Sequence, residues 1–114
     1  MNPPLSLSAM IEALFGVRTT YAENPLNNQV QVAVTQLLPG NPKRVGVVMV
    51  NLSVNTIWVA PNNRVATTLG IRLAANGGSM TLTWDKDFEI ISMPWYGMAS
   101  NINSEIYVIE YISR

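Results

Sequence analysis

The feature that most constrains this chain is a series of short apolar segments that begins at residue 30. Between residues 30 and 35, valine alternates with Gln, Ala and Thr, which is the period of a strand with one buried face. Six more apolar segments follow, at residues 44–52, 56–60, 65–73, 80–84, 88–91 and 106–112. About eight short strands, with turn sequences roughly every 8–12 residues, are typical of an antiparallel sandwich or barrel. We therefore predict an all-β fold, an antiparallel β-sandwich of jelly-roll type.

Individual segments refine this prediction. The nearly continuous apolar run at residues 44–52 predicts a central strand buried on both faces. Residues 85–87 are a charged turn that leads into the strand predicted at 88–91. The last strand, residues 106–112, has two apolar faces, so it either pairs across a subunit boundary or lies in the middle of a sheet.

The N-terminal region has a different period. Apolar residues recur at three- and four-residue spacing, which predicts a short amphipathic helix over residues 5–16 with the stripe Leu7, Met10, Ile11, Leu14 and Phe15. Residues 17–29 are polar and contain breakers, so we interpret them as a linker. The expected organisation is a helical arm and linker at 1–28 and a β-sandwich at 29–114. The arm either docks in a groove of a partner through its apolar stripe or packs on its own sandwich.

Charge is scarce in this sequence. Only 12% of the 114 residues are charged and 48% are apolar, whereas an ordinary soluble domain has about 25% charged residues. Because the cores of protein interfaces are depleted of charge, this composition favours a protein that lives in an assembly. The net charge is zero and no basic run occurs, which argues against nucleic-acid binding.

The residues that most often carry catalysis are missing. The chain has no Cys and no His, so it lacks thiolate metal ligands and the commonest general base near neutral pH. We expect no enzymatic activity and no cofactor. Asp85, Asp87 and Glu89 alternate and are candidate ligands for a hard cation such as calcium, but a solvated charged turn is the expected role.

Aromatic residues offer a second kind of site. Trp58 and Trp84 lie in apolar alternations and are expected in the core or in subunit contacts. Trp95 and Tyr96 follow Pro94 and precede a glycine, and we predict that they are partly exposed contact residues. A stacking platform for a sugar or a base is the alternative role of these aromatics.

Membrane insertion and export are not expected. No apolar run approaches the roughly 20 residues that a membrane helix needs. The predicted N-terminal helix has no Lys or Arg on its polar face, which argues against binding to a membrane surface. The first residues lack the positive start of a secretory signal, so synthesis in a cytoplasm without export is expected.

The order of segments between residues 44 and 112 resembles a group of small virion proteins of tailed bacteriophages, described as head-decoration (cement) or structural proteins. The resemblance rests on the strand 44–50, the Thr56–Val59 segment, the Gly77-Gly78 turn, the Trp95-Tyr96 pair and the closing strand 106–110. It implies a compact β-sandwich on a capsid or tail, with no catalytic residues to transfer. Decoration proteins of this kind are often symmetric oligomers, and a trimer would suit the local three-fold positions of an icosahedral shell.

The sequence therefore predicts a non-enzymatic virion structural protein. It would be made in the host cytoplasm, would bind the major capsid protein or other virion proteins, and would decorate and stabilise the capsid surface. Two alternatives remain open: a tail, neck or fibre component of a phage particle, and a carbohydrate- or receptor-binding β-sandwich module.

Overall fold

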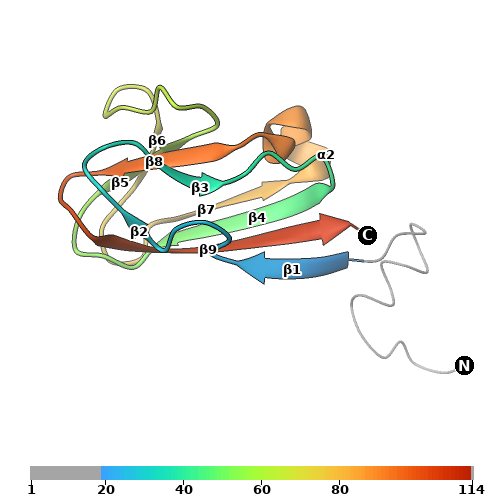
Figure 1. Ribbon diagram of the computed structural model, residues 1–114, viewed down its shortest axis with the longest axis horizontal. Helices are drawn as coiled ribbons and strands as arrows, with labels where there is room; N and C mark the ends of the chain where they lie inside the picture. Colours follow the sequence, from blue (N-terminus) through green and yellow to red (C-terminus); the bar gives the residue numbers. More distant parts are fainter. Residues whose placement is uncertain (1–18, 114) are drawn as a thin grey trace, which may run out of the picture.

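Two antiparallel sheets pack face to face in the computed structural model, which describes residues 19–113 (Figure 1). The first sheet has the order β1-β9-β4-β7, formed by Thr19–Glu23, Ser104–Ser113, Arg44–Asn51 and Ser79–Thr83, and the two-residue β2 (Gln29–Val30) also pairs with β9. The second sheet has the order β3-β8-β5-β6, formed by Thr35–Leu38, Trp95–Ala99, Ile57–Ala60 and Ile71–Leu73. The prediction of an all-β fold with antiparallel strands is confirmed.

The strands pair in a nested pattern. The first strands, β1 and β2, pair with the last strand, β9; β3 pairs with β8, β4 with β7, and β5 with β6. The chain is thus folded back on itself, with the segment 61–70 at the fold point. Pairs β4–β9 and β5–β8 then join the neighbouring hairpins into the two sheets.

The core lies between the sheets because alternate residues of each strand point inward. Met49 on β4 and Val108 on β9 are fully buried and lie opposite each other in the register. Ile57, Val59 and Trp95 are contributed by the second sheet and are equally buried. Each such side chain stabilises the fold by about 1.5–3 kcal/mol through its removal from water.

Strand β4 is central in its sheet, but it is not buried on both faces. Val47 and Met49 are buried, whereas Val48 and Val50 on the outward side are only half-buried. The prediction of two buried faces was wrong because no layer of the described residues covers the outer side of this sheet (Figure 1).

The segment predicted as a strand at 88–91 is helical instead. A short α2 (Trp84–Asp87) runs into a 3-10 helix, η1 (Phe88–Ser92). The Asp87 carboxylate accepts a hydrogen bond of 2.7 Å from the backbone N–H of Thr83 and so satisfies an N–H at the start of this helical turn. Ile91 still reaches the core from η1, which explains why its apolar character suggested a strand.

The polar stretch predicted as a linker contains β1. Residues Thr19–Glu23 pair with the end of β9 from Ser113 to Ile109, so the sandwich includes residues before the predicted boundary at 29. Asn24, which has a positive φ of 43°, ends this strand rather than marking a free linker. Within residues 19–113, no helix is long and apolar enough to cross a membrane.

A candidate protein-binding surface at the loop end

The nested pairing brings four connections to one end of the sandwich, which we call the loop end: residues 31–34, 52–56, 74–78 and 100–103. These join β2 to β3, β4 to β5, β6 to β7 and β8 to β9, and they lie together on the left of Figure 1. The opposite end, which we call the helical end, consists of the turn at 39–43 and the segment 84–94 with α2 and η1.

Hydrogen bonds join the four loops of the loop end in series. The Gln31 side chain donates to Asn103 Oδ1 (3.1 Å), which links the first loop to the last. The backbone N–H of Ser100 donates to Thr56 O (3.0 Å), and that of Asn76 donates to Ser53 O (2.8 Å). Each loop is therefore held by its neighbour, so the end is a connected surface rather than four independent tips.

Asn51, at the last position of β4, is the centre of this network. Its side chain is fully buried, and its amide donates to Asn55 O (2.7 Å) and Leu73 O (3.0 Å). Its Oδ1 accepts from the backbone N–H of Ser53 (2.9 Å) and from the Ser53 hydroxyl (2.7 Å). The two donors and the acceptor of the amide are all used, which ties the 52–56 loop to the end of β6.

Aliphatic side chains project from this polar platform into solvent. Their exposed fractions lie between 46% and 78%, and they are Val32, Val34, Leu52, Val54 and Ile102. Scattered exposed apolar residues are normal, but a group rimmed by polar residues marks an interaction site. Because hydrogen bonds fix the loops, a partner that covers these side chains would lose little loop entropy on binding.

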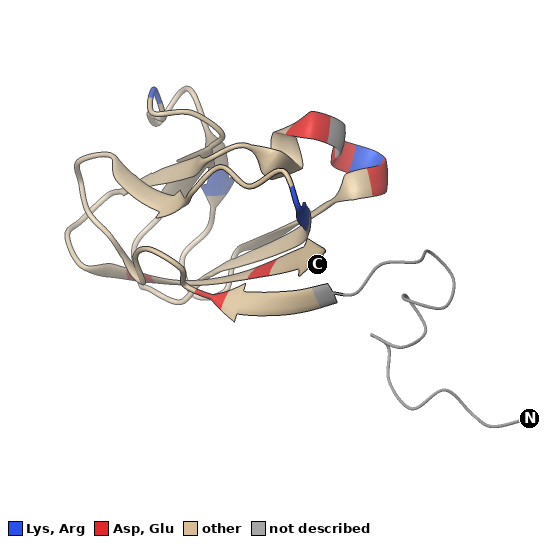
Figure 2. Ribbon diagram, turned by 45° about the vertical axis from the view of Figure 1, so that its right-hand side comes forward, with Lys and Arg blue, Asp and Glu red and all other residues tan. Residues whose placement is uncertain are grey.

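The loop end also contains no charged residue. None of its four loops has an Asp, Glu, Lys or Arg, whereas the helical end has five: Lys43, Asp85, Lys86, Asp87 and Glu89. In Figure 2, red and blue are most concentrated on α2 and η1, and the remaining coloured positions are scattered singly over the rest of the sandwich. Interface cores share the same depletion of charge, so the loop end has the composition of a protein-binding surface.

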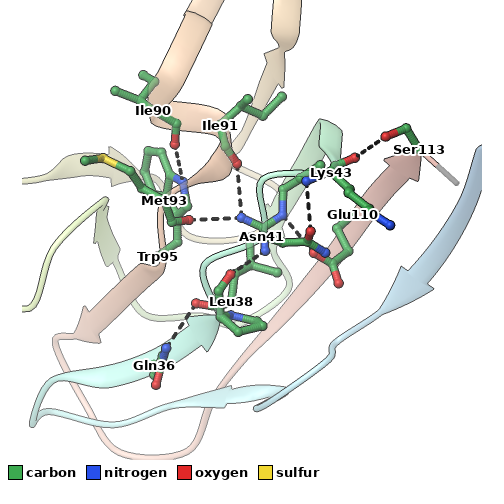
Figure 3. Close-up of polar contacts among 12 residues, drawn as sticks. Gln36, Leu38, Asn41, Lys43, Ile90, Ile91, Met93, Trp95, Glu110 and Ser113 are labelled. Carbon is green, nitrogen blue, oxygen red and sulfur yellow. Dashed lines mark hydrogen bonds and ion pairs between the residues drawn. The ribbon is translucent and has the colours of Figure 1, made fainter.

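The helical end is organised by a buried ion pair instead. Arg44 Nε lies 2.7 Å from Glu110 Oε2, and both side chains are almost completely buried. The guanidinium also donates to the carbonyls of Ile91 (3.0 Å), Met93 (2.9 Å) and Pro39 (Figure 3). These bonds tie β4 to β9, to the end of η1 and to the turn before β4. The pair is enclosed by protein, so we interpret it as structural.

Trp95 and Tyr96 were predicted as partly exposed contacts, and for Trp95 this was wrong. Its side chain is fully buried, and its indole Nε1 donates to Ile90 O (3.1 Å). The reason is the alternation along β8, which points Trp95 into the core and Tyr96 to the outer face of the second sheet. Tyr96 is half-buried there, beside the half-buried Trp58 and Met98, and the exposed tryptophan of the chain is Trp84.

The other predicted site residues are placed as follows. Leu7, Met10, Ile11, Leu14 and Phe15, the predicted arm, lie outside the described residues. No three acidic side chains among residues 19–113 are grouped closely enough to hold a metal ion, and Asp87 is hydrogen-bonded to backbone instead. An open hollow of about 370 Å³ lies between the end of β5 and the 61–70 loop, with Arg64, Leu69 and Ile71 in its lining.

Val32 and Val34 were predicted on the buried face of a strand over residues 30–35, which was wrong, because residues 31–34 form a loop and both side chains are exposed. Leu52 was predicted in a strand and lies just beyond the end of β4. Val54 and Ile102 lie in segments that were predicted as turns. A usable signal was present, since Val54 and Ile102 each lie between two turn-forming residues, in Ser-Val-Asn and Asn-Ile-Asn. An aliphatic residue at a turn tip has no core to enter, so this pattern predicts an exposed apolar side chain.

Comparisons of the chain with protein-family models, with curated proteins and with solved structures found no match.

Proposed function

We propose that this protein is a non-enzymatic structural component of a bacteriophage particle, which decorates the capsid surface by binding virion proteins through its loop end. The observation that carries the proposal is the charge-free loop end, with five exposed aliphatic side chains on a hydrogen-bonded platform. A rigid apolar surface of this kind is suited to another protein, because its burial removes apolar area from water without leaving charges unpaired.

The strand order supports a jelly roll as the finer description of the fold. A jelly roll has eight strands in two sheets and arises when a long antiparallel hairpin wraps upon itself. The pairs β1/β2–β9, β3–β8, β4–β7 and β5–β6 follow that nesting, and the two sheets have the matching orders. Jelly rolls are frequent in viral capsid proteins, which agrees with the proposed location on a virion.

The non-enzymatic part of the proposal is supported by the chemistry of the chain. Without His or Cys, the candidate acid–base groups are carboxylates, lysines and tyrosines. The one buried carboxylate of the described residues, Glu110, is bound to Arg44 and enclosed by backbone. No cofactor is needed for the proposed role.

Capsid binding gives a direct test, using shells of the encoding virus that lack this protein. The Val54→Asp/Ile102→Asp double variant places two charges on the loop end. The matched control, Asn63→Asp/Thr68→Asp, adds the same charge at exposed positions of the 61–70 loop. We expect wild type and control to co-sediment with the shells and to raise their disassembly temperature, and the loop-end variant to do neither. Shells that disassemble at the same temperature with and without the wild-type protein would contradict the stabilising role.

The proposed assembly is a homo-oligomer, with a trimer as the form that matches three-fold positions on the shell. Native mass spectrometry of the full chain measures the number of subunits in the oligomer. If labelling of intact particles locates the protein on a tail, neck or fibre, the capsid assignment is replaced by that alternative while the protein-binding role stands.

A carbohydrate-binding role has one supporting observation. The outer face of the second sheet has Trp58, Tyr96 and Met98 half-buried side by side in the register, and jelly rolls also occur in lectins. Aromatic faces stack on sugars, so a glycan array probed with wild type and with Tyr96→Ala tests this alternative. Binding that is lost in Tyr96→Ala would favour it over capsid decoration.

A further inference from the structure

On the outer face of the β1-β9-β4-β7 sheet, the two central strands have aromatic and aliphatic side chains where a solvent-facing sheet usually has polar ones. The edges of this face are partly polar, with Ser79 and Thr81 on β7 and Glu23 on β1. We call this surface the tyrosine face: it consists of Tyr21, Val48, Val50, Tyr107, Ile109 and Tyr111. These residues are register neighbours, since Tyr21 lies opposite Tyr111, Val48 opposite Ile109, and Val50 opposite Tyr107.

The tyrosine face is partly open to solvent. Tyr21 is 62% exposed and Tyr111 is 41% exposed, and the other members are half-buried. The Tyr111 ring lies against Gly46, where an added Cβ would come within 3.0 Å of it. Partial burial, followed by the charge of the nearby Glu23, raises the pKa of the Tyr107 hydroxyl above its ordinary value.

The chain that precedes this face is long enough to cover it. β1 begins at Thr19 and is the edge strand of this sheet, so the 18 residues before it start directly beside the face. The helix predicted for residues 5–16 would be roughly 18 Å long, close to the roughly 17 Å of a five-residue strand. Residues 17 and 18 join residue 16 to Thr19 through three Cα–Cα steps, which can span roughly 10 Å, about two strand spacings.

We propose that residues 5–16 dock through their apolar stripe on the tyrosine face of the same chain. So short a connection, of two residues, gives an effective concentration in the millimolar range, which favours this face over an unconnected partner. The stripe Leu7, Met10, Ile11, Leu14 and Phe15 has no charge, and the one charge in the segment, Glu12, falls on the opposite side of the predicted helix. This inference does not depend on the proposed function.

Disulfide trapping tests the docking directly, because the natural chain has no cysteine. The test pair is Leu14→Cys with Val48→Cys at the centre of the tyrosine face. The control pair is Leu14→Cys with Met98→Cys, which is half-buried on the outer face of the other sheet. We expect an intramolecular disulfide to form severalfold faster in the test pair, identified by peptide mass after digestion. A disulfide-linked dimer as the main product would overturn the proposal in favour of a second copy, and equal rates in both pairs would overturn docking on this face.

Tyrosine nitration is a second measurement that needs no cysteine. Ile11→Asp/Leu14→Asp places two charges on the stripe, and Ala9→Asp/Ala13→Asp places them on the opposite side of the predicted helix. Mass spectrometry of the full chain should show Tyr21 and Tyr111 nitrated severalfold faster in the first variant than in the second or in wild type. Equal nitration rates in all three proteins would overturn the docking. Neither result depends on whether the protein binds a capsid.

Discussion

Each end of strand β4 has a buried polar side chain that binds the surrounding loops, but the surfaces around the two ends differ. Arg44 at its first position and Asn51 at its last are both buried, at 2% and 0% exposure, and each side chain binds the loops around it. At the Arg44 end the surrounding segments are charged, whereas the four loops at the Asn51 end have exposed aliphatic residues and no charge, with the exposed Glu105 and Arg72 at their border. The exposed aliphatics therefore lie on loops that are as well bonded as those of the helical end, which points to a binding role rather than to incomplete packing.

The comparison is sharpest at Arg44, where the largest effect of a change at either end of β4 is expected. Arg44→Met should lower the free energy of unfolding by about 3–5 kcal/mol, because it leaves Glu110 buried without its partner. Arg64→Met, at an exposed loop position, is the control and should have little effect. Urea unfolding measures both.

A double variant separates the charge from the packing. Arg44→Met/Glu110→Leu removes both charges and should recover a large part of the loss, because neither group is then left unpaired. If Arg44→Met costs no more than Arg64→Met, the helical end is not organised by the ion pair and the comparison between the two ends fails.

Asn51→Ala should have the second largest effect. It leaves Leu73 O and the Ser53 N–H without their side-chain partner, at a cost of about 2–3 kcal/mol, while Asn55 O keeps the Ser53 hydroxyl as a donor. Asn63→Ala, an exposed turn residue, is the matched control. Hydrogen exchange should show faster exchange of the loop-end amides, Asn76 and Gly77, while amides of the helical end stay protected. Unchanged exchange at these two amides would mean that Asn51 does not hold the loops.

Much of this architecture could be predicted because hydrophobic periodicity is local. The apolar patterns at 44–52 and 106–112 predicted strands that the structure contains as β4 and β9. The strand predicted at residues 30–35 was wrong, because the chain leaves one sheet after Val30 and enters the other at Thr35. Two further failures have a tertiary cause. Thr19–Glu23 is a strand because the end of β9 is available to pair with it, and the segment after Thr83 is helical because the Asp87 side chain bonds back to the chain.

The candidate site was harder to predict, since it depends on which loops meet. No local pattern places Val32, Val54 and Ile102 at one end, because this follows from the nesting of four hairpins. Likewise, Arg44 and Glu110 are 66 residues apart, and their pairing is set by the β4–β9 register. Trp95 was misplaced because proline and glycine near it suggested exposure, whereas the phase of β8 decides its direction.

Glycine-to-alanine substitutions at the two ends of the sandwich should have smaller effects on stability. Gly77, in the 74–78 loop, has a φ of +111°, so Gly77→Ala should cost about 1 kcal/mol through backbone strain even though open space surrounds it. Gly40, in the turn of the helical end, has no such φ, and its added Cβ would make only ordinary contacts from 3.5 Å. Gly40→Ala should therefore be nearly neutral. Equal thermal shifts for the two variants would show that the 74–78 loop can relax, which would weaken the view of a rigid loop end.

The smallest effect is expected at the tip of the loop end. Val54 is 78% exposed, so Val54→Asp should change the free energy of unfolding by less than about 0.5 kcal/mol. Val47→Asp, on the buried side of β4, should by contrast prevent folding, because it buries an unpaired charge. Urea unfolding of Val54→Asp is decisive for the proposed function. If the variant is as stable as wild type, any loss of capsid binding measures the surface itself; a cost of 2 kcal/mol or more would mean that Val54 contributes to the fold, and the exposed aliphatics would no longer be a separate feature of this end.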